Sequence, residues 1–86
     1  MSNVEAAQAS IRSGHEVGQQ VLAALSAQNS SLEEVQNGLR YATQGSNQAE
    51  AEQANAELAA AKDKIDEARQ QVAAALAKFE LVAQHL

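Results

Sequence analysis

Two runs of apolar and small residues, one in each half of the chain, repeat with alternating steps of three and four residues. This spacing is the pattern of the a and d positions that meet along the seam of a coiled coil. Neither run changes phase, and the segment Gly45-Ser46-Asn47 separates them. Proline is absent, while Ala, Glu, Gln and Leu are abundant, a composition that favours helix throughout. The sequence therefore predicts an all-α fold, namely an antiparallel two-helix hairpin that resembles a coiled coil.

Each run is long enough for a helix of about 60 Å at a rise of about 1.5 Å per residue. The first run contains Val4, Ala7, Ile11, Gly14, Gly18, Val21, Leu25, Gln28, Leu32, Val35, Leu39 and Ala42. The second run contains Ala51, Ala54, Leu58, Ala61, Ile65, Ala68, Val72, Ala75, Phe79, Val82 and Leu86.

The 86 residues predict one small domain, 1–86, with a first helix at about 3–43, a turn at 44–47 and a second helix at about 48–85. Ser2 and Glu5 have the spacing of a capping box, which satisfies free backbone N–H groups at a helix start. Asn47 is the expected cap of the second helix, with Glu50 at its third position. Gly45 suits the left-handed conformation just after a helix.

One stretch offers an alternative with three helices. Asn29-Ser30-Ser31 has low helix propensity, and Ser31 could cap a new helix with Glu34 three residues later. A break would shift the phase of the repeat, whereas the repeat passes through this stretch unchanged. The unchanged phase favours one continuous first helix.

A turn centred on Ser46 and Asn47 sets which residues face each other, because the numbers of facing residues then add up to about 93. Phe79 faces Gly14 and Ala75 faces Gly18 in this register. A glycine inside a helix costs about 0.8–1 kcal/mol relative to alanine, so close approach of the two helices would explain both glycines. The predicted intra-hairpin seam contains Ile11, Gly14, Gly18, Val21, Leu25, Leu32, Val35, Leu39, Leu58, Ile65, Val72 and Phe79.

Gln28 is the polar exception in the first run. A single polar seam residue can set register or oligomeric state at a cost in stability. Alternatively, the side chain extends along the helix and keeps its amide in water. Both interpretations stay open at this point.

Apolar residues beside the two runs predict a second contact surface. A two-helix hairpin buries one narrow stripe per helix, so further apolar residues suggest that a wider face packs against something else. Dimerisation into a four-helix bundle, with a second copy or a co-encoded helical partner, is the expected solution. The alternative is a monomer with a modest apolar fringe. The candidate partner face contains Val17, Leu22, Leu76 and Leu81.

The charge pattern argues against several classes of function. Six Lys/Arg against eleven Asp/Glu give a net charge of −5, and the basic residues are scattered. Nucleic acids and anionic membrane surfaces attract clustered basic residues, so neither is an expected partner. Cysteine is absent, His15 and His85 are far apart in the register, and the carboxylates lie off the two runs. We therefore expect no catalytic, cofactor-binding or metal-binding residue, no small-molecule substrate and no enzymatic activity.

Three segments carry a resemblance to a known family. They are Val4-Glu5, Leu32-Glu33-Glu34-Val35-Gln36 and Gly45-Ser46-Asn47-Gln48. With two acidic, Ala/Gln-rich helices around a short turn, the chain resembles WXG100/ESAT-6-like helical hairpins. It is most similar to small actinobacterial hairpins encoded beside polymorphic toxins. The Trp-x-Gly turn is absent, and no acid follows Phe79 four residues on, where the family's export signal would require it.

The resemblance implies a partner or adaptor of a type VII-like secreted or toxin protein. Because the start of the chain lacks the basic and apolar regions of a Sec signal, we expect a cytoplasmic protein, or one exported by a Sec-independent route with a partner that carries the signal. The alternative function is a self-contained structural homodimer that scaffolds other parts and has no role in secretion.

Overall fold

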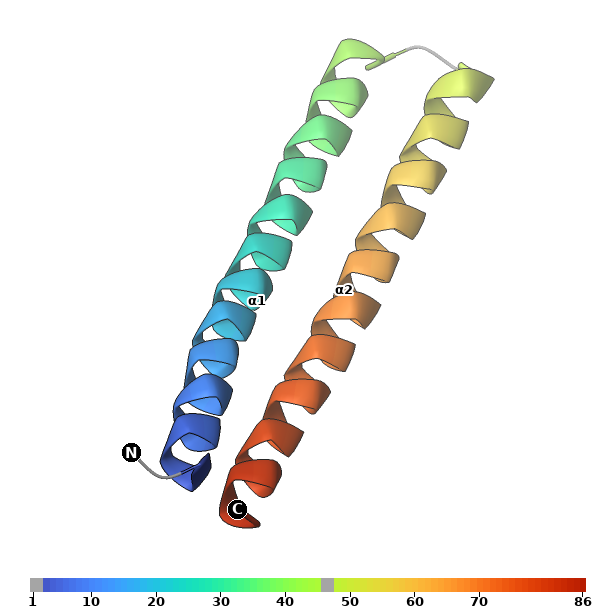
Figure 1. The fold of residues 1–86 in the computed structure, drawn as a ribbon. Helices are drawn as coiled ribbons and strands as arrows, with labels where there is room; N and C mark the ends of the chain where they lie inside the picture. Colours follow the sequence, from blue (N-terminus) through green and yellow to red (C-terminus); the bar gives the residue numbers. More distant parts are fainter. Residues whose placement is uncertain (1–2, 46–47) are drawn as a thin grey trace.

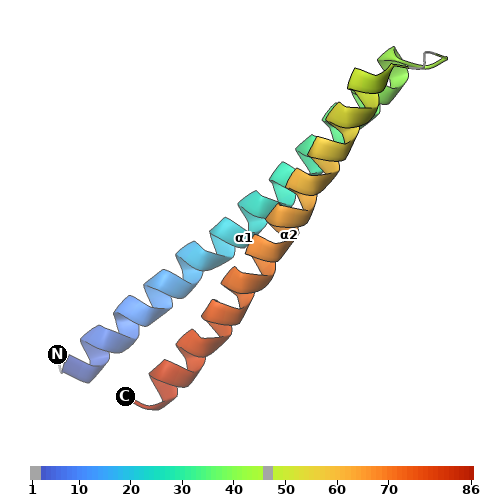
Figure 2. The same cartoon turned by 90° about the vertical axis from the view of Figure 1, so that its right-hand side faces the viewer.

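The computed structural model describes residues 3–45 and 48–86, and within them the fold is all-α. Helix α1 spans Asn3–Ala42 and helix α2 spans Ala49–Gln84. The two helices pack antiparallel in an extended hairpin measuring 66 × 15 × 12 Å (Figure 1). After a quarter turn the two rods overlap near the turn and separate toward the ends that carry the two termini (Figure 2). The predicted antiparallel hairpin is confirmed.

Helix α1 is continuous through Asn29-Ser30-Ser31, so the three-helix alternative is wrong. The helix ends with local hydrogen bonds: the backbone N–H of Thr43 donates to the carbonyl of Leu39, 3.0 Å away, and the Thr43 hydroxyl donates to the same carbonyl at 2.7 Å. Gly45 then has φ of +80°, the left-handed conformation expected after the helix.

The start of α2 differs from the expected cap. Gln48, with extended backbone at φ −105° and ψ 119°, takes the N-cap position and makes no side-chain capping bond. Its carbonyl accepts the first helical hydrogen bond, from the N–H of Glu52 at 3.3 Å. The predicted cap residues Ser2 and Asn47, and Ser46 in the turn, lie outside the described residues.

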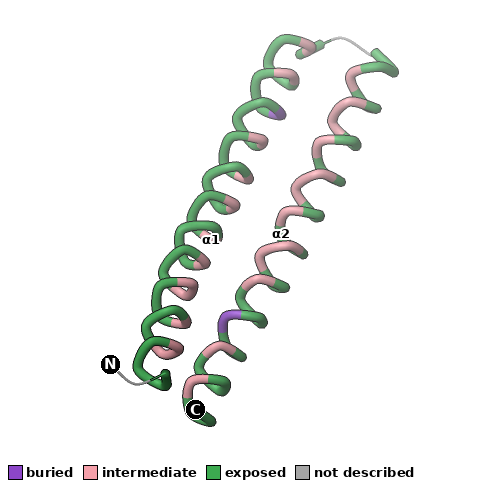
Figure 3. The backbone as a smooth tube through the Cα atoms, in the orientation of Figure 1, coloured by how far each residue is buried: buried purple, intermediate pink, exposed green. Residues whose placement is uncertain are grey.

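The core of the hairpin is a single line of contact between the helices. Figure 3 shows that the covered positions of each helix lie on the side that faces the other. We call this line the observed seam, and it repeats every three and four residues. On α1 it contains Gln8, Ile11, His15, Gly18, Leu22, Leu25, Asn29, Leu32, Gln36, Leu39 and, just past the helix end, Thr43. On α2 it contains Ala51, Asn55, Leu58, Lys62, Ile65, Arg69, Val72, Leu76, Phe79 and Ala83.

Nine of the twelve residues of the predicted seam belong to the observed seam, and each apolar run shares one of its two alternating positions with it. The shared residues, all half-buried, are Ile11, Gly18, Leu25, Leu32, Leu39, Leu58, Ile65, Val72 and Phe79. At the other position of each run, the residue that faces the partner helix is the next one in the sequence after the predicted residue. Val21 and Val35 are therefore 42% and 54% exposed, while Leu22 and Gln36 face α2 in their place. Gly14 stays half-buried, beside the observed seam.

The packing of Leu76 explains the shift on α2. Leu76 is 6% exposed and fills the space left by Gly18, where an added Cβ would lie 2.9 Å from Leu76 Cδ1 and 3.1 Å from its Cγ. The predicted neighbour Ala75 is exposed instead. Leucine fills this notch with more apolar surface than alanine could, which favours the observed rotation of the helix. One layer further out, Phe79 packs against Gly14 as the register predicts.

Candidate interaction surface

The two broad faces of the hairpin differ in chemistry. One face, here called the polar face, holds the residues that follow the shared seam positions in sequence. It contains Arg12, Gln19, Ser26, Glu33 and Arg40 on α1, and Glu52, Ala59, Asp66, Ala73 and Glu80 on α2. Two shallow grooves of about 340 and 410 Å³ are lined by residues of this face from both helices, so both helices present it on the same side.

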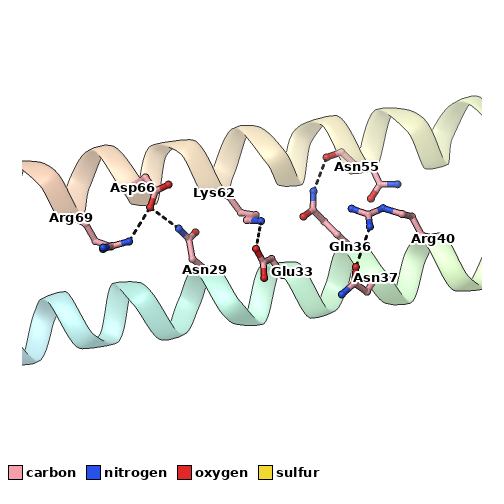
Figure 4. A network of polar contacts seen from close by, with 9 residues as sticks. All are labelled: Asn29, Glu33, Gln36, Asn37, Arg40, Asn55, Lys62, Asp66 and Arg69. Carbon is pink, nitrogen blue, oxygen red and sulfur yellow. Dashed lines mark hydrogen bonds and ion pairs between the residues drawn. The ribbon is translucent and has the colours of Figure 1, made fainter.

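Two of the polar contacts that join the helices involve residues of the polar face (Figure 4). Lys62 forms an ion pair with Glu33 at 2.9 Å, and Asn29 donates a hydrogen bond to Asp66 at 3.1 Å. Asp66 also pairs with Arg69 along α2, at 3.1 Å. The hydrogen bond from Lys62, and then its positive charge, lower the pKa of the Glu33 carboxyl below its ordinary value. These contacts stabilise this side of the hairpin only modestly, because they are exposed.

The opposite face carries no charge on its two inner rows. We call it the uncharged face, and it holds the residues that precede the shifted seam positions in sequence. It contains Ala7, Gly14, Val21, Gln28, Val35 and Ala42 on α1, and Ala54, Ala61, Ala68, Ala75 and Val82 on α2. Apart from the observed seam, every described residue that is partly covered belongs to this face.

The candidate partner face predicted from the sequence is not one surface. Val17 and Leu81 are 55% and 54% exposed, but Val17 borders the uncharged face while Leu81 lies on the outer side of α2. Leu22 is half-buried against α2, and Leu76 is the most buried apolar residue of the described chain. Leu22 and Leu76 therefore pack between the two helices of the hairpin and do not belong to a partner surface.

The sequence reasoning missed Val21, Val35 and Val82 as surface residues because it placed them on the stripes that form the seam. In the structure they are 42%, 54% and 52% exposed on the uncharged face. The signal that could have found them is the row of uncharged residues at every seventh position of each helix, such as Ala54 and Ala61 on α2. The described helices leave this row only partly covered by the rest of the hairpin.

Among residues 3–45 and 48–86, neither helix has a stretch sufficiently long and apolar to cross a bilayer. In the same residues, no group of three or more His, Asp or Glu side chains is arranged to hold a metal ion. Comparisons with known protein families, curated proteins and solved structures find no match to this chain. The extended hairpin with its exposed apolar residues is consistent with a module that binds a protein partner.

Proposed function

We propose that this protein is a non-catalytic helical module that binds another protein by helix–helix packing on its uncharged face. The observation that carries this proposal is the direction of the apolar stripes. In each helix the stripe shares one position per seven residues with the observed seam, while its other position lies one residue earlier. Since one residue turns an α-helix by about 100°, the stripe centre is rotated by about 50° from the other helix toward the uncharged face.

A rotation of this size has a simple geometric meaning. In a two-stranded coiled coil the stripe points straight at the partner helix. In a four-helix bundle each helix has two neighbours at right angles, and its stripe points at the bundle axis, about 45° from either neighbour. Both helices of this hairpin are turned toward the same face. A second layer of helices on that face would complete the burial of both stripes.

The resemblance stated above supports a finer proposal about the partner. Such hairpins act as partners or adaptors of type VII-like secreted or toxin proteins, so we propose this role, with export by a Sec-independent route when the partner supplies the signal. Residues Leu32-Glu33-Glu34-Val35-Gln36 of the resemblance include Val35, which lies exposed on the proposed docking face.

The test compares two single-charge variants that differ only in the face they alter. Val35→Glu places a charge on the uncharged face, and Gln19→Glu places one on the polar face, at residues that are both exposed. Light scattering after size exclusion would be measured for the protein alone and for the protein mixed with any helical protein that is encoded beside it. We expect Val35→Glu to abolish the association seen with the wild type, and Gln19→Glu to preserve it. The proposal fails if the wild type associates neither with itself nor with such a protein, or if the two variants behave alike.

A further inference from the structure

We infer that the occupant of the uncharged face is a second copy of this chain, docked face to face with the two turns at opposite ends of the bundle. The twofold axis would pass between Gln28 and its copy and between Ala68 and its copy. This inference rests on the proposed function, since it names the partner of the same face. It differs from that function in predicting one particular register.

The first support is a palindrome of residue sizes on α1. Moving outward from Gln28 along the uncharged face, the chain has a valine on each side, Val21 and Val35, and then a small residue on each side, Gly14 and Ala42. A twofold contact between identical helices pairs each residue with its mirror position. Val21 therefore meets Val35 of the second copy, and Gln28 meets Gln28 of the second copy. The two amides can hydrogen-bond to each other, which would fix the register.

Helix α2 has a matching centre. Moving outward from Ala68, the uncharged face has Ala61 and Ala75 and then Ala54 and Val82. A row of alanines allows two α2 helices to approach closely along their length. The larger Val82 meets Ala54 of the second copy, so the one bulky residue of the row has a small counterpart.

The two centres lie within about two residues, or about 3 Å, of the same height in the hairpin, so a single axis can pass close to both. Asn29, next to Gln28, donates its hydrogen bond to Asp66, two residues from Ala68. A twofold axis perpendicular to the two helices can therefore pass between both helices and their copies at this level. The coincidence is independent of the size palindrome, because the bond lies on the opposite, polar face.

Charge complementarity along the edge of the face favours the same arrangement. The exposed charged residues of α2 that border the uncharged face are Glu50, Glu57, Lys64 and Lys78. In the proposed register Glu57 meets Lys78 of the second copy, and symmetry makes this pair twice. On α1 the bordering residues Ser10, Val17 and Ala24 are uncharged, so nothing there opposes close approach. With both turns at one end, α1 would lie on α2 and neither Glu57 would meet Lys78.

The size of the face is sufficient for a stable dimer. A flat face of 66 by 15 Å corresponds to roughly 1,000 Å² per copy, without the extra surface that protruding side chains add. A standard specific interface buries about 800 Å² per partner. The absence of charge from its two inner rows means that docking leaves no unpaired ion there.

A charge-exchange experiment tests the register. Val21→Glu and Val35→Lys are made singly and together, and the oligomeric state is measured by sedimentation with circular dichroism on the same samples. We expect a wild-type dimer, and for each single variant a dimer weakened by about 100-fold, because each buries a charge without a partner. The double variant should dimerise again, since the carboxylate introduced at position 21 would meet the ammonium introduced at position 35 of the second copy. Within one chain the two positions are about 21 Å apart along α1, so they cannot pair with each other.

Cysteine variants provide a second measurement that does not depend on introduced charges. The chain has no native cysteine. Under mild oxidation Ala68→Cys should form a disulfide-linked dimer, whereas Ser26→Cys on the polar face should remain monomeric under denaturing electrophoresis. Equal cross-linking of both variants would overturn the inference, whether or not the charged variants fold.

The remaining outcomes separate this inference from the proposed function. A wild-type monomer at about 100 μM, or a double variant that stays dissociated while the wild type is dimeric, overturns the second copy in this register. The proposed function survives that result if the co-encoded partner binds and Val35→Glu abolishes the binding. If Val35→Glu has no effect on any association, the proposed function fails as well.

Discussion

The contact between Gly18 and Leu76 gives the sharpest prediction about the hairpin itself. Alanine at a helical glycine usually stabilises by about 0.8–1 kcal/mol through helix propensity. At Gly18 the added Cβ would lie 2.9 Å from Leu76 Cδ1 and closer still to Cδ2, so the leucine or the helix must move. Overpacking of this kind costs about 1–3 kcal/mol. We expect Gly18→Ala to lower the free energy of unfolding by up to about 2 kcal/mol once the propensity gain is included.

Gly38 is the matched control, because the same added Cβ has nothing within 4 Å there. Gly38→Ala should gain the full propensity and stabilise by about 1 kcal/mol, raising Tm by about 4–8 °C in a domain of this size. Urea denaturation followed by circular dichroism, at several protein concentrations, would measure both variants. If Gly18→Ala stabilised as much as Gly38→Ala, the described packing of Leu76 would be refuted.

A double-mutant cycle attributes the penalty to the leucine. Leu76 is 6% exposed, so Leu76→Ala alone should cost about 2–5 kcal/mol. In that background the Cβ at position 18 meets open space, and Gly18→Ala should become stabilising. A coupling energy smaller than about 0.5 kcal/mol would show that the two residues do not compete for the same space.

Three further outcomes follow from the structure. Leu76→Glu should lose helicity, because it buries a carboxylate inside the hairpin; a helical variant that merely fails to associate, as measured by circular dichroism and sedimentation, would contradict the described burial. Asn55→Ala should stabilise by about 1 kcal/mol in urea denaturation, since its side-chain oxygen is buried without a hydrogen-bond partner in the described structure, and unchanged stability would mean that this oxygen costs nothing. Lys62→Met should raise the Glu33 pKa toward 4.5, as measured by NMR titration, and an unchanged titration would exclude the pair in solution. Because this pKa is lowered in the folded state, the stabilisation from the pair is present above pH 4.5 and is lost as the pH falls through the folded-state pKa.

The fold could be predicted because the phase of the repeat is a long-range signal that single weak residues do not erase. Asn29-Ser30-Ser31 has poor helix propensity, yet packing of Leu25 and Leu32 on either side keeps α1 continuous through it. The position of Gly45 followed from its freedom to adopt positive φ. These features depend on backbone preferences and periodicity, which the sequence carries directly.

The rotation of each helix could not be predicted in the same way. The apolar stripe identifies the side of a helix that avoids water, but not which neighbour covers it. In the hairpin the seam takes polar residues such as Asn29 and Gln36, because Asn29 bonds Asp66 and Gln36 donates to the carbonyl of Asn55 at 3.3 Å. Leu76 completes the arrangement by filling the Gly18 notch. Side-chain fit between two particular surfaces decided the rotation, and the period of the pattern contains no information about it.

The distribution of large side chains along the hairpin has a consequence for how it forms. Near the turn the helices meet through Gln36 and Asn55, whereas Leu76 and Phe79 meet the two glycines at the open end, far from the turn. Leu39 and Leu58 near the turn are only half-buried, so a chain that closes from the turn reaches its deepest apolar burial only when segments about 60 residues apart come together, after most of the loop-closure entropy has been spent. Short pieces containing only the turn and its adjoining helical segments would accordingly have little stability of their own. Deletion of a few helical turns at the open end should therefore unfold many more residues than it removes.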